Sequence, residues 1–171
     1  MTAKFSTTAR IRLGHAGDAE DLAAIFRSSW ELAYRGVIPH LALERMIRNR
    51  GPQWWRQAGL HGEHRPLLLA IDGKLAGYAT SGRSRSRGRP QGEIYELYLA
   101  PTYQGLGFGE RLFEAARTKL DERGLSGLLV WVLADNTPAC NFYWRRGGRP
   151  VTSSTERFGA VRLEKIAFVW E

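Results

Sequence analysis

The stretch LYLAPTYQGLGFGERLFEAA, residues 97–116, joins an apolar, aromatic run to a helical pattern. Pro101 ends the apolar run, which predicts a strand before it and a turn after it. Glycine inside a regular element costs stability, so three glycines at alternate positions need a structural reason. A glycine-rich turn that leads into a helix exposes backbone N–H groups and lets an anion approach closely. The stretch therefore predicts an anion-binding turn between a strand and a helix, formed by Gly105, Gly107 and Gly109.

On either side of this stretch, the chain predicts strands and helices in the order β-α-α-β-β-β-α-β-α-β-β, a mixed α/β sheet with helices on its faces. We expect a helix with Asp18 as its N-cap. We expect a hairpin that turns at Asp72-Gly73. The remaining strands are predicted within residues 9–18, 93–101, 127–135 and 149–171, and the remaining helices within residues 40–50, 108–124 and 136–148.

Length and composition predict one globular domain that covers residues 1–171. The chain is 43% hydrophobic and 25% charged, as in ordinary soluble proteins. No apolar run has the length of a membrane span, and the first residues lack the apolar core of a signal peptide. The single Cys140 cannot form an internal disulfide and is expected to be a buried structural thiol. We therefore expect a cytoplasmic protein that does not bind membranes.

The chain is strongly basic, with a net charge of +8, which favours anionic partners. Part of this charge lies in the run RSRSRGR, residues 83–89, which is predicted to be a mobile loop. A protein that binds single-stranded nucleic acid would require aromatic residues interleaved with this run, and it has none, so nucleic acid is not expected as a partner. The segment HGEH, residues 61–64, has too few ligands for a metal site, and no metal is expected.

Two known phosphate-binding patterns fit the glycines poorly. The Walker loop requires a lysine after its last glycine, and the dinucleotide fingerprint has a different spacing. The stretch instead resembles the Q/R-x-x-G-x-G/A motif of the GNAT superfamily of N-acetyltransferases, and the order of elements extends the resemblance over nearly the whole chain. The resemblance implies that acetyl-CoA binds here through its pyrophosphate, at Gln104, Gly105, Leu106, Gly107, Phe108 and Gly109.

A second segment, NTPACNFYWRRGG, resembles the N-x-x-A-x-x-x-Y helix of the same family. The resemblance implies that Asn136 contacts the pantetheine or nearby backbone, and that Tyr143 lies beside the thioester sulfur. It also implies a mostly antiparallel, twisted sheet of about seven strands, flanked by about four helices and splayed at the cofactor cleft. One departure is that Gly147-Gly148 stands where the family usually has Gly-Phe.

Acetyl transfer to an amine needs a group that takes a proton from the ammonium, donors for the developing oxyanion and a proton for the departing thiolate. Glu93 resembles the position of the base in some family members, while Glu96 and a water chain remain open alternatives. The odd spacing of the two glutamates predicts that they lie on opposite faces of the strand, with Glu93 on the same face as Leu97 and Leu99. Tyr143 is the predicted acid.

The family holds pantetheine, and stabilises the oxyanion, through the backbone of this strand, which often bulges here. The resemblance assigns that role to Leu97, Tyr98 and Leu99. The family's first two helices line the acceptor pocket, which makes Trp30, Tyr34 and Arg35 candidate acceptor contacts.

We therefore expect an acetyl-CoA-dependent N-acetyltransferase that moves an acetyl group to a primary amine by direct transfer in a ternary complex. The acceptor is a small molecule or a peptide, and the positive charge favours one that is neutral or anionic apart from its amine. The alternatives are an inactive acyl-CoA-binding or nucleic-acid-binding module and an enzyme that uses a longer acyl donor. The apolar residues 166–170 are a poor composition for an exposed edge, which predicts a homodimer through the C-terminal strand or a neighbouring surface.

Overall fold

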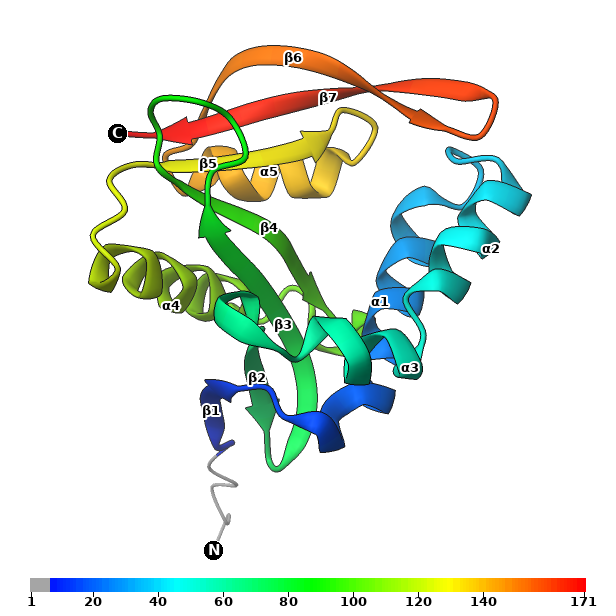
Figure 1. The fold of residues 1–171 in the computed structure, drawn as a ribbon, viewed down its shortest axis with the longest axis vertical. Coiled ribbons are helices and arrows are strands. Elements are labelled where there is room, and N and C mark those ends of the chain that lie inside the picture. Colours follow the sequence, from blue (N-terminus) through cyan, green and yellow to red (C-terminus); the bar gives the residue numbers. More distant parts are fainter. Residues whose placement is uncertain (1–6) are drawn as a thin grey trace, which may run out of the picture.

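The computed structural model describes residues 7–171, and its strands form one seven-stranded sheet in the order β1-β2-β3-β4-β5-β7-β6 (Figure 1). The β4–β5 pair is parallel, and the other neighbouring pairs are antiparallel. The predicted mixed, mostly antiparallel sheet is confirmed. The strands are β1 (Ala9–Leu13), β2 (Leu67–Ile71), β3 (Lys74–Arg83), β4 (Gly92–Leu99), β5 (Leu128–Leu133), β6 (Arg149–Phe158) and β7 (Val161–Trp170).

The helices lie on both sides of the strands (Figure 1). Buried side chains of α1 and α2, with Trp54 of α3 beside them, pack with one side of the sheet, and those of α4 and α5 pack with the other. Four of the helices match predicted segments, and the single turn α3 was not predicted. The helices are α1 (Ala19–Tyr34), α2 (His40–Asn49), α3 (Pro52–Trp54), α4 (Phe108–Glu122) and α5 (Thr137–Arg145). None of the helices in the described residues has the length and apolarity that a membrane span requires.

Strands β4 and β5 diverge after a short contact. They pair only at Gly92–Leu128 and Glu93–Leu129, while β4 continues to Leu99. From residue 94 onward, the side of β4 that faces away from β3 is therefore not covered by β5. This opening is the predicted splay in the sheet, and it separates the β1–β4 half from the β5–β7 half.

A bulge in β4 overturns the predicted faces of the two glutamates. On β3, Ser81 pairs with Ile94 and Thr80 pairs with Glu96, so Tyr95 is an extra residue on β4. Because a bulge shifts the alternation by one residue, Glu93 and Glu96 lie on the same face. The predicted opposite faces are wrong, and Leu97 and Leu99 instead pack in the core on the α4 side.

The C-terminal strand is not an edge of the sheet. Strand β7 lies between β5 and β6 and pairs with both along its length. The premise that its apolar residues line an exposed edge is therefore wrong, because β6 covers them. The edge on this side is β6, whose residues are exposed from Arg149 to Arg157.

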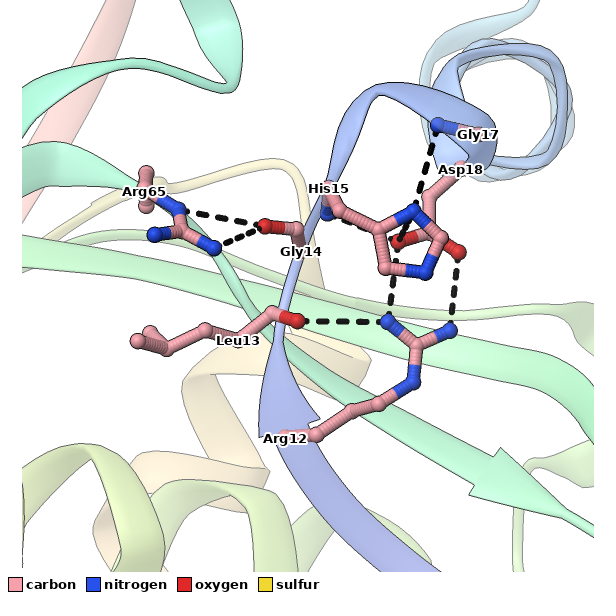
Figure 2. A network of polar contacts seen from close by, with 7 residues as sticks. All are labelled: Arg12, Leu13, Gly14, His15, Gly17, Asp18 and Arg65. Carbon is pink, nitrogen blue, oxygen red and sulfur yellow. Dashed lines mark hydrogen bonds and ion pairs between the residues drawn. The ribbon is translucent and has the colours of Figure 1, made fainter.

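The start of α1 was predicted correctly, but not its capping. The side chain of Asp18 makes no capping hydrogen bond to α1. It instead accepts hydrogen bonds from Arg12 Nη1 and Nη2, at 2.9 and 2.8 Å, and from the His15 backbone N–H at 2.8 Å (Figure 2). The hydrogen bonds from Arg12 lower the pKa of this buried carboxyl. Asp18 thereby ties β1 to the start of α1.

Candidate functional site

A cleft of about 1350 Å³ lies at the opening between β4 and β5. Its border includes residues from α1, β3, β4, the glycine turn, β5 and α5. Most of the predicted site residues meet there. These are Trp30, Tyr34, Leu97, Tyr98, Leu99, Gln104, Gly105, Gly107, Gly109, Asn136 and Tyr143.

The glycine turn leaves the start of α4 bare. Gly107 is the N-cap of α4 in the left-handed region, with φ of 84°, and no side chain caps this helix. Gly105 has φ of 75°, and a Cβ added at either glycine would meet no atom within 4 Å. The first N–H groups of a helix have no acceptor within it, so those of α4 remain available to an anion. The turn therefore fits a phosphate or pyrophosphate.

Not every residue of the motif faces the cleft in the same way. A Cβ at Gly109 would lie 3.1 Å from Phe142, so this glycine allows α4 and α5 to pack closely. Gln104 turns inward, and its Nε2 donates to the Leu99 carbonyl at 3.2 Å. Leu106 and Phe108 do not border the cleft, and Leu106 is exposed. The turn thus offers backbone groups rather than side chains.

The backbone of β4 presents polar groups to the opening. The N–H of Ala100 donates to Ala76 on β3 at 2.7 Å. Because backbone groups alternate in direction along a strand, those of Tyr98 also point to β3, while those of Leu97 and Leu99 point toward the opening. The Leu99 carbonyl accepts from Ser29 Oγ at 3.4 Å as well as from Gln104. Of the three predicted backbone contacts, Leu97 and Leu99 have the suitable direction.

Tyr143 lies on α5 within an aromatic cluster and borders the cleft. Its ring packs at centroid distances of 6.0 Å from Phe113, 5.1 Å from Phe142 and 5.9 Å from Trp170. Within residues 7–171 its hydroxyl has no hydrogen-bond partner. Burial raises the pKa of this hydroxyl, which keeps it protonated and able to donate.

Asn136 joins α5 to α1. Its Oδ1 accepts from the Ala139 N–H at 3.3 Å and caps α5, while its Nδ2 donates to the Tyr34 hydroxyl at 3.3 Å. Burial raises the pKa of Tyr34. Both residues border the cleft, but these bonds already occupy part of the hydrogen-bonding capacity of Asn136.

Glu93 is buried beneath an arginine. Its Oε1 accepts from Arg85 Nε and Nη2, at 3.2 and 2.6 Å, and its Oε2 accepts from the Arg85 backbone N–H at 2.9 Å. Only 1% of its side chain is exposed. Arg85 borders the cleft and Glu93 does not.

Glu96 borders the cleft and is held from two sides. Arg50 Nη2 donates to both of its oxygens, at 2.9 and 3.1 Å. From β3, Tyr78 donates to Oε2 at 3.2 Å and Thr80 donates to Oε1 at 3.3 Å. The carboxylate is therefore fixed in orientation and still partly exposed to the cleft.

The acceptor side of the cleft has more residues than the sequence predicted. Trp30 packs between Phe26 and Tyr34, at centroid distances of 5.2 and 4.7 Å, and borders the cleft. Arg35 lies elsewhere, on the surface beside Glu31. Arg50 and Trp54 were missed, because Arg50 ends a predicted helix without any sign of its partner Glu96, and the stretch that holds Trp54 has no clear periodicity.

Two further predictions from the sequence concern Cys140 and a metal site. Cys140 donates weakly to the Leu133 carbonyl, with Sγ at 3.9 Å, and burial raises the pKa of its thiol. These contacts agree with a structural thiol. Among residues 7–171, no three His, Cys, Asp or Glu side chains are grouped so that they could hold a metal ion.

Comparison with known families gives a clear match. The model of the acetyltransferase (GNAT) family matches residues 21–147. The N-acetyltransferase YuaI of Bacillus subtilis is 28% identical over 163 residues, which cover 94% of this chain and 91% of the relative. The mycothiol acetyltransferase of Nocardia farcinica is 34% identical over 105 residues, but these cover only 32% of that protein.

The fold is also similar to solved structures. The PaiA N-acetyltransferase of Thermoplasma acidophilum, solved in complex with coenzyme A, superposes with a TM-score of 0.71 at 21% identity. The match covers 92% of this chain and 98% of that chain.

Proposed function

The chain belongs to the acetyltransferase (GNAT) family, and from this premise we propose that it transfers an acetyl group from acetyl-CoA directly to a primary amine in a ternary complex. The proposal rests most on one observation. The opening between β4 and β5 joins a bare helix start, suited to pyrophosphate, to a carboxylate and a tyrosine hydroxyl on the border of one cleft.

The donor side of the cleft fits coenzyme A. The empty space at Gly105 and Gly107 admits a pyrophosphate, which the N–H groups at the start of α4 would bind. The backbone groups of Leu97 and Leu99 would hold the pantetheine arm, as a strand at the unpaired edge of β4. When bound, acetyl-CoA supplies the activated acetyl group.

We assign the proton-accepting role to Glu96. The amine must lose a proton before it can attack, and a fixed carboxylate on the border of the cleft is suited to receive it. Glu93 remains the competing assignment from the sequence, but it does not border the cleft, and the Arg85 side chain and backbone N–H bind its Oε1 and Oε2. A water chain that leads to Glu96 is compatible with the same geometry.

Tyr143 has the properties of the acid. Its hydroxyl is protonated, borders the cleft and has no partner within the described residues. We propose that it donates a proton to the departing thiolate. The backbone N–H of Leu99 is our candidate donor for the oxyanion.

The acceptor pocket would lie beside Trp30 and Tyr34, which border the cleft from α1. We propose a small molecule or a peptide as the acceptor, in the cytoplasm, which the single cysteine supports. A homodimer is a further proposal, and the exposed edge strand β6 offers unpaired backbone groups for it. Light scattering at micromolar concentration tests the dimer.

The proposal is tested by calorimetric titration with acetyl-CoA, followed by an assay of CoA release across amine classes. We expect saturable binding of acetyl-CoA and release of CoA that depends on an added amine. Binding without release for every amine class would leave an inactive acyl-CoA-binding module as the better interpretation. Parallel titrations with longer acyl-CoAs test the acyl chain length.

A further inference from the structure

The Arg50–Glu96 ion pair gives the acceptor side of the cleft a positive and a negative group side by side. Arg50 uses Nη2 for both oxygens of Glu96. Its Nε is buried without a partner, and its Nη1 makes no hydrogen bond within residues 7–171. Nη1 is therefore the guanidinium nitrogen left to donate to a ligand, and Arg50 borders the cleft.

Aromatic rings hold Arg50 in this position. The Cζ atom lies 4.5 Å from the ring centroid of Phe26, 4.0 Å from that of Trp54 and 5.0 Å from that of Trp55. Cation–π contacts of this kind restrict a guanidinium while leaving its N–H groups free to donate. Arg50 is thus a fixed cation rather than a mobile surface side chain.

This arrangement discriminates between amines by their second charge. An ammonium that approaches Glu96 also approaches Arg50, and the like charge repels it. A carboxylate on the same acceptor molecule relieves this repulsion, because it pairs with the guanidinium while the amine pairs with Glu96. The four charges then alternate in sign, which a simple amine or a polyamine cannot achieve.

We infer that the acceptor is a small zwitterion, an α-amino acid or a close analogue, with its amine at Glu96 and its carboxylate at Arg50. The inference rests on the proposed function and names the substrate class of that site. The aromatic surfaces of Trp30 and Trp54 on the same border favour an apolar or aromatic side chain. Arg50 is then the residue that determines specificity for the carboxylate.

The test compares phenylalanine with phenylalanine amide and phenethylamine, which keep the amine and the ring but lack the carboxylate. We expect kcat/KM for phenylalanine to be about 10- to 100-fold higher, as for one charge-assisted hydrogen bond. Calorimetry with the enzyme–CoA complex should give a similar ratio of dissociation constants. Equal or better use of the amide, the bare amine or a peptide N-terminus overturns the inference and leaves the proposed function intact.

Two variants identify the source of the preference. Arg50→Met should remove the difference between phenylalanine and its amide while acetyl-CoA binding stays unchanged. The control Arg56→Met removes an arginine that pairs with Glu20 at 2.9 Å outside the cleft, and it should keep the preference. If Arg50→Met does not fold, Arg50→Lys should still reduce the preference, because a lysine lacks the planar, stacked donor group.

A preference that persists in a folded Arg50 variant overturns the inference. Absence of CoA release with every amine, despite tighter binding of phenylalanine, would instead refute only the proposed function.

Discussion

The N-terminal ends of helices α1 and α4 have opposite surroundings. The start of α1 is enclosed by polar partners, with Asp18 bound by Arg12 and His15, and with His15 Nδ1 accepting from the Gly17 N–H at 3.2 Å (Figure 2). The start of α4 has a glycine as its N-cap and no capping side chain. Neither helix has a side chain that caps it, so the difference lies in the residues that surround its first turn.

The contrast separates a structural junction from a binding site. At α1, the chain enters through a turn in which the Ala19 N–H donates to the Ala16 carbonyl, and Asp18 fixes the connection between β1 and the helix. At α4, side chains are absent and the adjoining cleft is open, so only a ligand or water can satisfy the N–H groups. A change at α4 should therefore affect binding, whereas a change at the α1 junction should affect stability.

The largest effect is expected for Gly107→Val, at the N-terminus of α4, which no side chain caps. A valine Cβ would occupy the space reserved for the pyrophosphate, and φ of 84° disfavours a β-branched residue. We expect the dissociation constant of acetyl-CoA to rise at least about 100-fold, the loss of two charge-assisted hydrogen bonds. Isothermal titration calorimetry on the folded variant measures this change.

Gly124→Val provides the matched control at the other end of α4. Gly124 has φ of 70°, and a Cβ there would also meet no atom within 4 Å. Both variants should lose a similar free energy of unfolding, about 1–3 kcal/mol for strained backbone. Only the Gly107 variant should lose affinity, and equal affinities in the two variants would refute the pyrophosphate site.

The next effect distinguishes the two glutamates. Glu96→Gln keeps the size, and its carbonyl oxygen can still accept from Arg50, but it cannot accept a proton, so kcat should fall about 100- to 1,000-fold, within the range for a general base. The remaining rate should keep rising with pH as free amine accumulates. Glu93→Gln breaks the buried contact with Arg85, so we expect it to lower the free energy of unfolding while kcat changes less than about threefold. Steady-state kinetics over pH, together with urea denaturation, measures both, and the reverse pattern would return the base to Glu93.

A smaller effect is expected for Tyr143→Phe, which keeps the ring in its aromatic cluster and deletes only the hydroxyl. The thiolate is a tolerable leaving group, because a thiol has a pKa of about 8.5. We therefore expect kcat to fall about 10- to 100-fold at unchanged affinity for acetyl-CoA. Kinetics and calorimetry on the same preparation test this, and an unchanged kcat would reduce Tyr143 to packing.

The fold was largely predictable because its signals are local. The Asp72-Gly73 turn, the proline at the end of β4 and the helical spacing in α4 each act within a few residues. The glycine motif was predictable for the same reason. The sequence did not place the bulge at Tyr95, because the bulge depends on how β4 pairs with β3. Without it, Glu93 and Glu96 were wrongly expected on opposite faces of the strand.

The acceptor side was less predictable because it is assembled from distant segments. Arg50 lies at the end of α2, Glu96 lies on β4, and Tyr78 and Thr80 lie on β3. Trp54 and Trp55 follow Arg50 closely in the sequence, but Phe26, the third ring beside its guanidinium, comes from α1. The sequence also could not show that Arg85 binds Glu93, because this contact depends on the path of the loop between β3 and β4.

The smallest effect is expected for Asp18→Asn, at the junction between β1 and α1. The bonds from Arg12 lower the pKa of Asp18, so its ionised form stabilises the folded protein. This stabilisation is complete above the unfolded pKa of about 3.9 and is lost as the pH falls through the lower folded value. We expect the variant to lose about 1–2 kcal/mol of unfolding free energy at pH 7 and less at an acidic pH below about 3.9, measured by urea denaturation. Acetyl-CoA affinity should not change, because the α1 junction is outside the cleft.

The control Glu20→Gln removes an exposed carboxylate in the first turn of the same helix, paired with Arg56, and should leave stability unchanged. A stability loss in Asp18→Asn that is the same at both pH values would show that packing, rather than charge, holds this junction.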